Sequence, residues 1–446
     1  MAVVSRLLPR PPGRKRLVLA LPQFFRVRQN FPDDRLDDVS GRVHAELARL
    51  SLAGRIGAGQ TVALTASSRG IAQLPVILRA AVDHLRLLGA APFAVPAMGS
   101  HGGATAEGQL ALLAAAGVTE TSIGCPIRSS MDTKVLFESE DGFPVHFDRQ
   151  ALEADHVLLC GRVKLHTELD GDFQSGLAKM LLIGLGKHEG AKIYHRAIRD
   201  FGFDHIVRTV VPRVFAAAHV VGGLAIVENA CGHTASIDAL APQEILDREP
   251  KLLMAAQGSM AGLPFDEVDL LIVDEIGKQI SGTGMDTNVI GRKGEPLVAQ
   301  RPRVKRIFVR SLTAASLGNA AGIGLAEFTT ERLIDQIDRR ALAINCITSG
   351  HVEVGRLPLA MRTDREAIEA ALSTVGLVAP QDARILWIES TAALGEVECS
   401  SAYLPQLVHG GHERLEAIAG LEDLPLDTDG NLPAEGVRAA RRRATA

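Results

Sequence analysis

The chain has 446 residues, and its charge is nearly balanced, with 48 Lys and Arg against 52 Asp and Glu and a formal net charge of −4. This balance argues against a nucleic-acid-binding protein, because such proteins usually have a strongly basic domain or stripe. Apolar residues make up 46% and charged residues 22%, a composition typical of globular chains and not of disordered ones. Because aromatic residues make up only 4% and there are 43 glycines, we expect an aliphatic core and glycine-rich tight loops.

Cysteine usage and the N-terminus bear on the compartment. The five cysteines are scattered and form no CxxC pair, which argues against a disulfide framework or a zinc cluster. No run of about 18 uninterrupted apolar residues exists, so we expect no transmembrane helix. The apolar run Leu17–Leu21 ends at Pro22 and is too short for a signal peptide, so it is interpreted as a first strand. We therefore expect a cytoplasmic protein without a membrane or nucleic-acid partner, and the sequence leaves a homo-oligomer open.

Short apolar runs alternate with helical patterns along the chain. The expected strands are 62–65, 92–95, 156–160, 220–227, 268–273, 306–309, 343–347 and 384–388. The expected helices are 75–88, 105–116, 332–340 and 365–374. Such alternation is typical of α/β folds with mainly parallel sheets.

The length predicts two or three domains at roughly 150 residues each. A helix is expected to end and a new strand to begin within 258–264, which makes this segment the best linker. We expect an N-terminal domain over residues 1–260, a second α/β domain over 261–437, and a solvated basic tail over 438–446.

The first of four polar segments is Ser67-Ser68-Arg69, between an expected strand and an expected helix. Backbone N–H groups at a helix N-terminus suit an anion, and Arg69 could clamp a phosphate or carboxylate with two hydrogen bonds. A plain capped turn with a surface arginine is an equally good interpretation.

The second segment is a Gly-Ser-His-Gly-Gly loop that presents His101, again between strand and helix. It lacks the lysine of a P-loop and the spacing of GxGxxG. Thr105 is the expected N-cap of the following helix, and Gly117 its end. A lone histidine is usually a structural or surface residue, but ligands bind at the carboxyl edge of open α/β sheets. We therefore favour a functional role for His101.

The third segment places His166, His188 and His195 within about thirty residues, together with several lysines. A helix would put His188 and His195 on one face, two turns apart. A three-histidine zinc site lacks a matching spacing signature, and a charged, exposed segment is the alternative. Lys179 borders the apolar run 180–185, which favours a partly desolvated amine suited to covalent or base chemistry.

The fourth segment, residues 275–292, also follows an expected strand and is rich in Gly, Ser, Thr, Asp and Asn. This composition suits a substrate with many hydroxyl or carboxylate groups, whereas an ordinary polar loop is the alternative. We expect substrate contacts from Lys278, Asp286, Asn288 and Arg292.

These residues carry a family resemblance. The chain resembles the nickel-dependent lactate racemase family in the order and spacing of His101, His166, Lys179 and His195. The turn that ends in Arg69 is similar to that family's anion-binding turn, which typically reads Asp-x-Thr-Arg-Pro. The resemblance covers most of the first 230 residues and, more loosely, the rest.

The resemblance implies two α/β domains with the active site in the cleft between them, and a nickel-pincer nucleotide as cofactor. By this resemblance Lys179 would carry the cofactor covalently and His195 would ligate the nickel. His101 and His166 would be the acid/base pair. The turn residues Ser67, Ser68 and Arg69 would hold nucleotide phosphate or substrate carboxylate. Cofactor-synthesis enzymes are the implied partners.

The implied reaction is inversion of a 2-hydroxy acid, in which hydride leaves one face of the carbon and returns to the other. Histidine suits the accompanying proton transfers because its ordinary pKa of about 6.5 lies near working pH. The chain departs from the family where Ala66 and Gly70 flank the anion-binding turn and where Leu177-Ala178 precedes Lys179. We therefore expect a larger, more polar acid than lactate, such as a sugar acid, and epimerisation.

Two other classes compete with the isomerase. A nicotinamide-dependent oxidoreductase would need GxGxxG followed by an acidic residue about 20 positions on, and neither is found. A non-catalytic protein that binds a nucleotide or sugar acid would not need Lys179, His195 and both candidate bases together.

Overall fold

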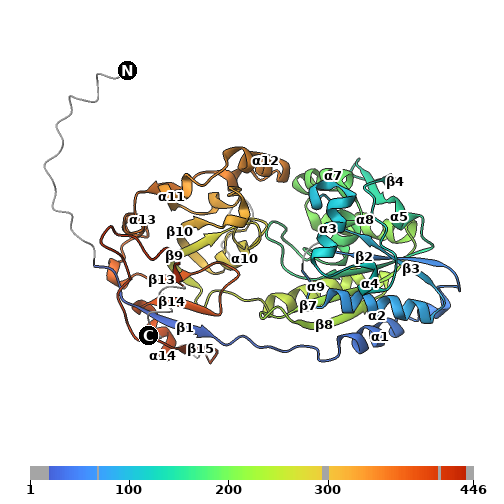
Figure 1. Ribbon diagram of the computed structural model, residues 1–446, viewed down its shortest axis with the longest axis horizontal. Helices are drawn as coiled ribbons and strands as arrows, with labels where there is room; N and C mark the ends of the chain where they lie inside the picture. The colour runs from blue at the N-terminus through green and yellow to red at the C-terminus, as the bar shows by residue number, and fades with distance from the viewer. Residues whose placement is uncertain (1–19, 68–69, 294–300, 410–412, 438–446) are drawn as a thin grey trace, which may run out of the picture.

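The structure, a computed structural model, describes residues 20–67, 70–293, 301–409 and 413–437. The chain forms two α/β halves side by side (Figure 1). Each half is built on one of the two larger sheets, in which most neighbouring strands are parallel. The expected α/β fold with mainly parallel sheets is confirmed. In the ranges described, no helix is long and apolar enough to cross a membrane.

The first half contains a five-stranded sheet that is parallel except for its last strand. Its order is β3 (Ala91–Pro96), β2 (Thr61–Ala66), β6 (His156–Arg162), β7 (Val220–Glu228) and the antiparallel β8 (Thr234–Leu240). A separate hairpin joins β4 (Thr133–Glu138) to β5 (Pro144–Asp148). The helices are α1 (Val39–Arg49), α2 (Leu74–Leu87), α3 (Ala106–Ala115), α4 (Glu120–Ile123), α5 (Arg149–Leu152), α6 (Leu177–Lys179), α7 (Lys187–Phe201), α8 (Phe203–Ala217) and α9 (Pro242–Gly258).

Both faces of this sheet are buried. Along β6, Val157 and Leu159 belong to one hydrophobic cluster, whereas Leu158 and Cys160 belong to another. Alternate side chains of a strand point to opposite faces, so these clusters lie on the two sides of the sheet. This explains why the parallel strands are continuous apolar runs in the sequence.

The second half contains an eight-stranded sheet. Its order is β12 (Leu359–Met361), β11 (Phe328–Thr330), β10 (Arg303–Leu312), β9 (Glu267–Ile276), β13 (Ile385–Ile388), β14 (Glu396–Ser400), β1 (Phe24–Gln29) and β15 (Leu415–Ala417). In this order, the strands from β12 to β13 pair in parallel. The pairs β13–β14, β14–β1 and β1–β15 are antiparallel. The helices are α10 (Thr287–Ile290), α11 (Glu331–Ile334), α12 (Arg339–Ser349), α13 (Asp364–Leu372) and α14 (Leu404–His409).

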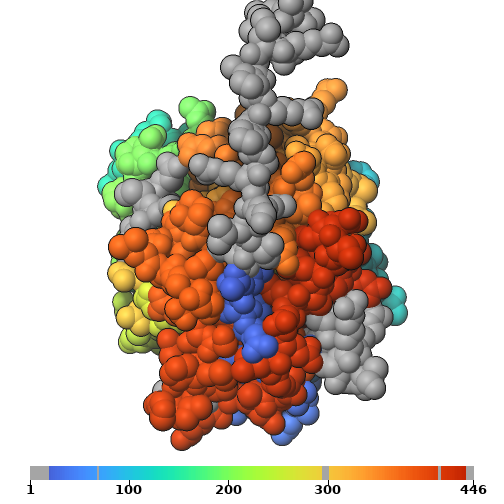
Figure 2. All heavy atoms as spheres, turned by 90° about the vertical axis from the view of Figure 1, so that its left-hand side faces the viewer, coloured from blue at the N-terminus to red at the C-terminus, as the bar shows by residue number. Residues whose placement is uncertain are grey.

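The first strand belongs to the second half. Strand β1 pairs with β14 and β15, and Figure 2 shows this blue segment between orange and red surfaces of the C-terminal residues. Strand β1 therefore does not belong to the N-terminal domain that was expected over residues 1–260. The strand also begins at Phe24 and not within Leu17–Leu21, of which 17–19 lie outside the described residues. The expected basic tail, 438–446, lies outside them as well.

Residues 343–347 were expected to form a strand, and this expectation is wrong, because they lie in helix α12. Asp338 caps the helix by accepting from the backbone N–H groups of Arg340 and Ala341. Leu342 and Cys346, one turn apart, are its buried residues. The expected helix over 332–340 is likewise wrong, because α11 ends at Ile334 and a turn precedes α12. Most other expected strands and helices are found with their ends shifted by a few residues.

Candidate functional site

The carboxyl ends of three neighbouring parallel strands bring the sequence candidates together. Ser67 follows β2, the His101 loop follows β3, and the loop with His166 follows β6. Carboxyl ends of parallel strands meet at the same edge of a sheet, which is where open α/β sheets bind ligands. The Ser67 hydroxyl is buried, and it has no hydrogen-bond partner among the residues that the structure describes. Ser68 and Arg69, the other predicted residues of this turn, lie outside the described residues.

Gln109 of α3 holds the backbone of the His101 loop by hydrogen bonds. The fully buried Gln109 amide donates from Nε2 to the carbonyls of Gly99 (2.9 Å) and His101 (3.4 Å). Gly102 has a φ of +66°, and a Cβ there would lie 2.5 Å from the Gly108 carbonyl carbon. The loop thus leaves the His101 side chain exposed on a fixed backbone. Thr105 caps α3 as expected, accepting from the Gly108 N–H at 3.0 Å.

Lys187 supports this loop from the core. Its ammonium group is fully buried and donates to the carbonyl of Pro96 (2.6 Å) and to Gln109 Oε1 (3.0 Å). It also pairs with the buried carboxylate of Asp148 at 3.1 Å. Burial lowers the pKa of Lys187 and raises the pKa of Asp148. Sequence reasoning placed Lys187 only in a charged segment, and nothing in the sequence marked it as a core residue.

His166 has a defined ring geometry. Its Nδ1 accepts hydrogen bonds from the backbone N–H groups of Glu168 (3.0 Å) and Leu169 (3.1 Å). Its own backbone N–H donates to Gln174 Oε1 at 2.7 Å. Because Nδ1 accepts from two donors, the neutral ring carries its proton on Nε2.

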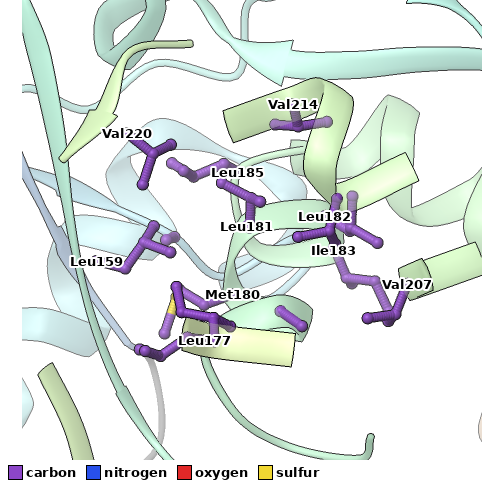
Figure 3. Close-up of a cluster of buried hydrophobic side chains, with 14 of the residues drawn as sticks. Leu159, Leu177, Met180, Leu181, Leu182, Ile183, Leu185, Val207, Val214 and Val220 are labelled. Carbon is purple, nitrogen blue, oxygen red and sulfur yellow. The ribbon is translucent and has the colours of Figure 1, made fainter. Parts of the chain in front are cut away.

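Lys179 ends the short helix α6, at the start of a π-helical turn over Met180–Gly184. All five residues of that turn are buried, and Figure 3 shows several of them in an apolar cluster with Leu159 and Val220. Lys179 itself is partly buried. An amine beside such an apolar cluster would be partly desolvated, and this stays a prediction for Lys179.

The helix that carries Lys179 is capped by a carboxylate far away in the sequence. Glu249 of α9 is fully buried, and its Oε2 accepts from the backbone N–H groups of Leu177 (2.8 Å) and Ala178 (3.1 Å). Burial raises the pKa of Glu249 to about 7, although the two N–H donors act in the opposite direction. A Cβ at Gly176 would overlap Glu249 Oε1, so glycine is needed there. Sequence reasoning missed Glu249, although it occupies the apolar stripe of α9 between Ile245 and Leu253.

His195 lies on α7 near several charges. Burial is the main cause that lowers its pKa, Glu168 opposes this effect, and Lys179 and His351 reinforce it. His195 therefore interacts electrostatically with Lys179 from α6, with the loop after β6, and with a histidine of the second half. A neutral imidazole is the form that ligates a metal. His188, on the same helix, has a buried Nδ1 that finds no hydrogen-bond partner in the described part of the chain.

His351 was missed by sequence reasoning. It follows Gly350, which ends α12, and its Nδ1 lies 3.1 Å from Glu353 Oε1. Its Nε2 faces Glu168 Oε2 of the first half at 3.8 Å. The Arg199 guanidinium of α7 donates to the Gly350 carbonyl. The only sequence signal was a histidine after a glycine that ends a helix, and a misassigned strand over 343–347 obscured it.

The start of α10 also contacts the first half. Thr287 Oγ1 donates to the Thr167 carbonyl at 2.7 Å, and Asn288 Nδ2 donates to the His166 carbonyl at 3.3 Å. Asn288 Nδ2 further donates to Asp286 Oδ1 at 2.9 Å. Two of the expected substrate residues, Asp286 and Asn288, therefore lie beside the His166 loop.

The other two expected substrate residues make contacts inside the second half. Lys278 Nζ donates to the Gly282 carbonyl of its own loop at 2.5 Å. Arg292 pairs with Glu327 at 2.7 Å and donates to the carbonyls of Leu325 and Val304. These contacts join β10 to the segment before β11, so the structure uses Arg292 for packing.

A cavity of about 730 Å³ lies elsewhere, at the carboxyl ends of β9, β10 and β13. Its lining is Asp274, Glu275, Arg310, Ser311, Arg332, Gln336, Glu389, Asp427, Asn431, Leu432, Ala434 and Glu435. The Arg310 guanidinium on this wall pairs with Asp274 and Asp364 and donates to the carbonyls of Leu432 and Pro433. The described candidates from the sequence are not part of this lining.

No family model and no curated protein matches the sequence. Among solved structures, the chain is similar to the lactate racemase apoprotein from Thermoanaerobacterium thermosaccharolyticum, with 13% identity and a TM-score of 0.49. The match covers 83% of this chain and 99% of that chain. At this identity and TM-score, nothing about the activity of this chain follows from the likeness.

Proposed function

We propose that this protein is an isomerase that inverts a carbon of a 2-hydroxy acid with the help of a nickel-pincer nucleotide. The observation that carries the proposal is the electrostatic interaction between Lys179 and His195. They lie on different helices, and the charge of Lys179 influences the pKa of His195. His101 and His166 follow adjacent strands at the same sheet edge.

The residues fit the cofactor in three respects. The Lys179 amine, beside an apolar cluster, suits covalent attachment. Within the described parts of the chain, no three His, Cys, Asp or Glu side chains gather to hold a metal ion. His195 would be the protein ligand of a nickel ion that the cofactor itself holds. The orphaned Ser67 hydroxyl lies where the anion-binding turn with Ser68 and Arg69 is proposed to hold phosphate.

When bound, the cofactor supplies reversible acceptance of hydride, and the protein supplies positions and proton transfers. His101, exposed on a loop that Gln109 fixes, is a proton carrier in this proposal. Asp286 and Asn288 beside the His166 loop add polar groups for the hydroxyls of a sugar acid. Such an acid would make the enzyme an epimerase.

The test is co-expression with the cofactor-synthesis enzymes, followed by intact mass and nickel analysis. We expect an added mass on the chain and bound nickel, and we expect Lys179→Ala to lose both. His195→Ala keeps Lys179, so it should retain the added mass and lose nickel. An unmodified chain without nickel under these conditions would contradict the cofactor assignment. A loaded chain that inverts neither lactate nor gluconate nor another 2-hydroxy acid of a broad panel would contradict the activity alone.

A further inference from the structure

Two histidines between the halves have opposite hydrogen-bond arrangements. His351 Nδ1 lies 3.1 Å from Glu353 Oε1, whereas His166 Nδ1 accepts from the backbone N–H groups of Glu168 and Leu169. An ionised carboxylate only accepts, so His351 Nδ1 must carry a proton. A backbone N–H only donates, so His166 Nδ1 must carry none.

These arrangements give the two neutral rings different chemistry. Neutral His351 has its lone pair on Nε2 and is a proton acceptor there. Neutral His166 carries its proton on Nε2 and is a hydrogen-bond donor there. Protonating His166 would add a proton to Nδ1. This proton would face the two backbone N–H donors and break their hydrogen bonds to Nδ1. His166 is therefore suited to polarise an oxygen and unsuited to take up a proton.

The surroundings of His351 favour a hydroxyl donor next to its Nε2. Glu168 Oε2 faces Nε2 at 3.8 Å, which is too long for a direct hydrogen bond. A lone pair and a carboxylate oxygen repel each other. Either the ring is protonated at Nε2 or, in the neutral ring, a donor such as a hydroxyl lies between the two atoms. The side chains of His351 and Glu168 remain 30% and 24% exposed, so a small molecule has access.

We propose that His351, oriented by Glu353, accepts the hydroxyl proton of the 2-hydroxy acid, and that His166 donates a hydrogen bond to the substrate. This assignment rests on the proposed function and changes the role that the resemblance implies for His166. In the proton-transfer step the substrate O–H bond breaks, an Nε2–H bond forms, and Glu353 balances the charge of the ring. The hydrogen on carbon would leave as hydride, and the nickel-pincer nucleotide, when bound, would supply the two-electron acceptor that balances this step.

This base would come from the second half, so the site would be complete only when the halves are in contact. Arg199 of α7 donates to the Gly350 carbonyl and so fastens the His351 loop to the first half. Among the described residues, the charged or titratable groups near His351 include Glu353 on its own segment. Across the boundary they include Glu168, His195 and Arg199.

Nitrogen-15 NMR of histidine-labelled, cofactor-free protein tests the assignment without any turnover. At pH 8 we expect His351 to carry its proton on Nδ1 and His166 on Nε2, with the signals assigned by loss in His351→Gln and His166→Gln. Glu353→Ala should shift His351 toward the Nε2–H tautomer, whereas the matched Glu353→Gln retains an acceptor and should keep Nδ1–H. A proton on Nε2 of His351 at pH 8, either alone or together with Nδ1–H, would overturn the proposal.

A second measurement separates this proposal from the proposed function. In cofactor-loaded protein, His351→Gln should lower turnover by about 100-fold or more, the usual contribution of a proton-transfer group. If the tautomers are as expected but the cofactor-loaded protein inverts no 2-hydroxy acid, the proposed function is rejected. Normal turnover of loaded His351→Gln would reject the role of His351 and leave the function standing.

Discussion

Lys187 and Asp148 form an ion pair whose two side chains are fully buried, with Nζ and Oδ2 3.1 Å apart. Lys187 also adopts a φ of +55°, unusual for a residue with a side chain. The structure satisfies the ammonium group with a backbone carbonyl and with Gln109, which in turn holds the His101 loop. The pair thus connects the core of the first half to a candidate site residue.

Replacing one partner of this pair should be strongly destabilising. Lys187→Met leaves the carboxylate of Asp148 buried and unpaired, which typically costs about 3–5 kcal/mol. We expect the double variant Lys187→Met/Asp148→Asn to recover part of that loss, because no buried charge remains. Urea unfolding of the three proteins measures both effects, and a loss below about 1 kcal/mol in Lys187→Met would contradict the role of the pair.

Glu249 should make stability depend on pH. Burial raises the pKa of Glu249 from its ordinary value of 4.5 to about 7, so the folded protein holds this proton more tightly than the unfolded chain does. The contribution of Glu249 to stability is then complete below pH 4.5 and is lost as the pH rises to about 7. The difference corresponds to about 3 kcal/mol.

Glu249→Gln isolates this effect, because the amide oxygen still accepts from the backbone of α6 but does not titrate. Between pH 5 and pH 8 the wild-type protein should lose a few kcal/mol more unfolding free energy than Glu249→Gln. Denaturant unfolding at the two pH values gives the comparison, in which the other titrating groups cancel. Equal pH dependence in the two proteins would show that Glu249 stays ionised throughout.

The sequence predicted the fold class because buried parallel strands are apolar runs that helical periods separate. It failed at 343–347, where β-branched and apolar residues fit both a strand and a helix. The segment forms a helix because the Asp338 carboxylate caps it and because Leu342 and Cys346, one turn apart, are both buried. The sequence also could not assign Phe24–Gln29 to the second half, because β1 pairs with β14 across about 370 positions of the chain.

The candidate site was predictable where side chains follow strands, since strand ends share an edge. Ser67, His101 and His166 are such residues. His351 and Glu249 were not predictable, because their places depend on packing between distant segments. Arg292 shows the opposite limit. The polar segment around it suggested a substrate contact, whereas in the structure it pairs with Glu327 and donates to the carbonyls of Leu325 and Val304.

The contact between the halves at Thr287 should protect the His166 loop. Thr287→Val removes the hydrogen bond to the Thr167 carbonyl, worth about 1 kcal/mol. We expect faster hydrogen exchange in peptides that cover 166–175. Thr329→Val is the matched control, because Thr329 Oγ1 donates to the Val309 carbonyl within the second half at 2.9 Å. Unchanged exchange over 166–175 in Thr287→Val would show that this contact does not hold the loop.

Gly102 and Gly103 offer a matched pair for testing how the His101 loop is fixed. Both have a φ of +66°, so alanine is similarly strained at either position. A Cβ on Gly102 would lie 2.5 Å from the Gly108 carbonyl carbon, whereas a Cβ on Gly103 meets no heavy atom within 4 Å. Gly102→Ala should therefore destabilise the protein by about 1–3 kcal/mol more than Gly103→Ala. Because helix α3 would have to move with Gly108, Gly102→Ala should also abolish inversion in cofactor-loaded protein. Equal stability and equal turnover in the two variants would mean that the loop is free to shift and that His101 does not depend on this backbone.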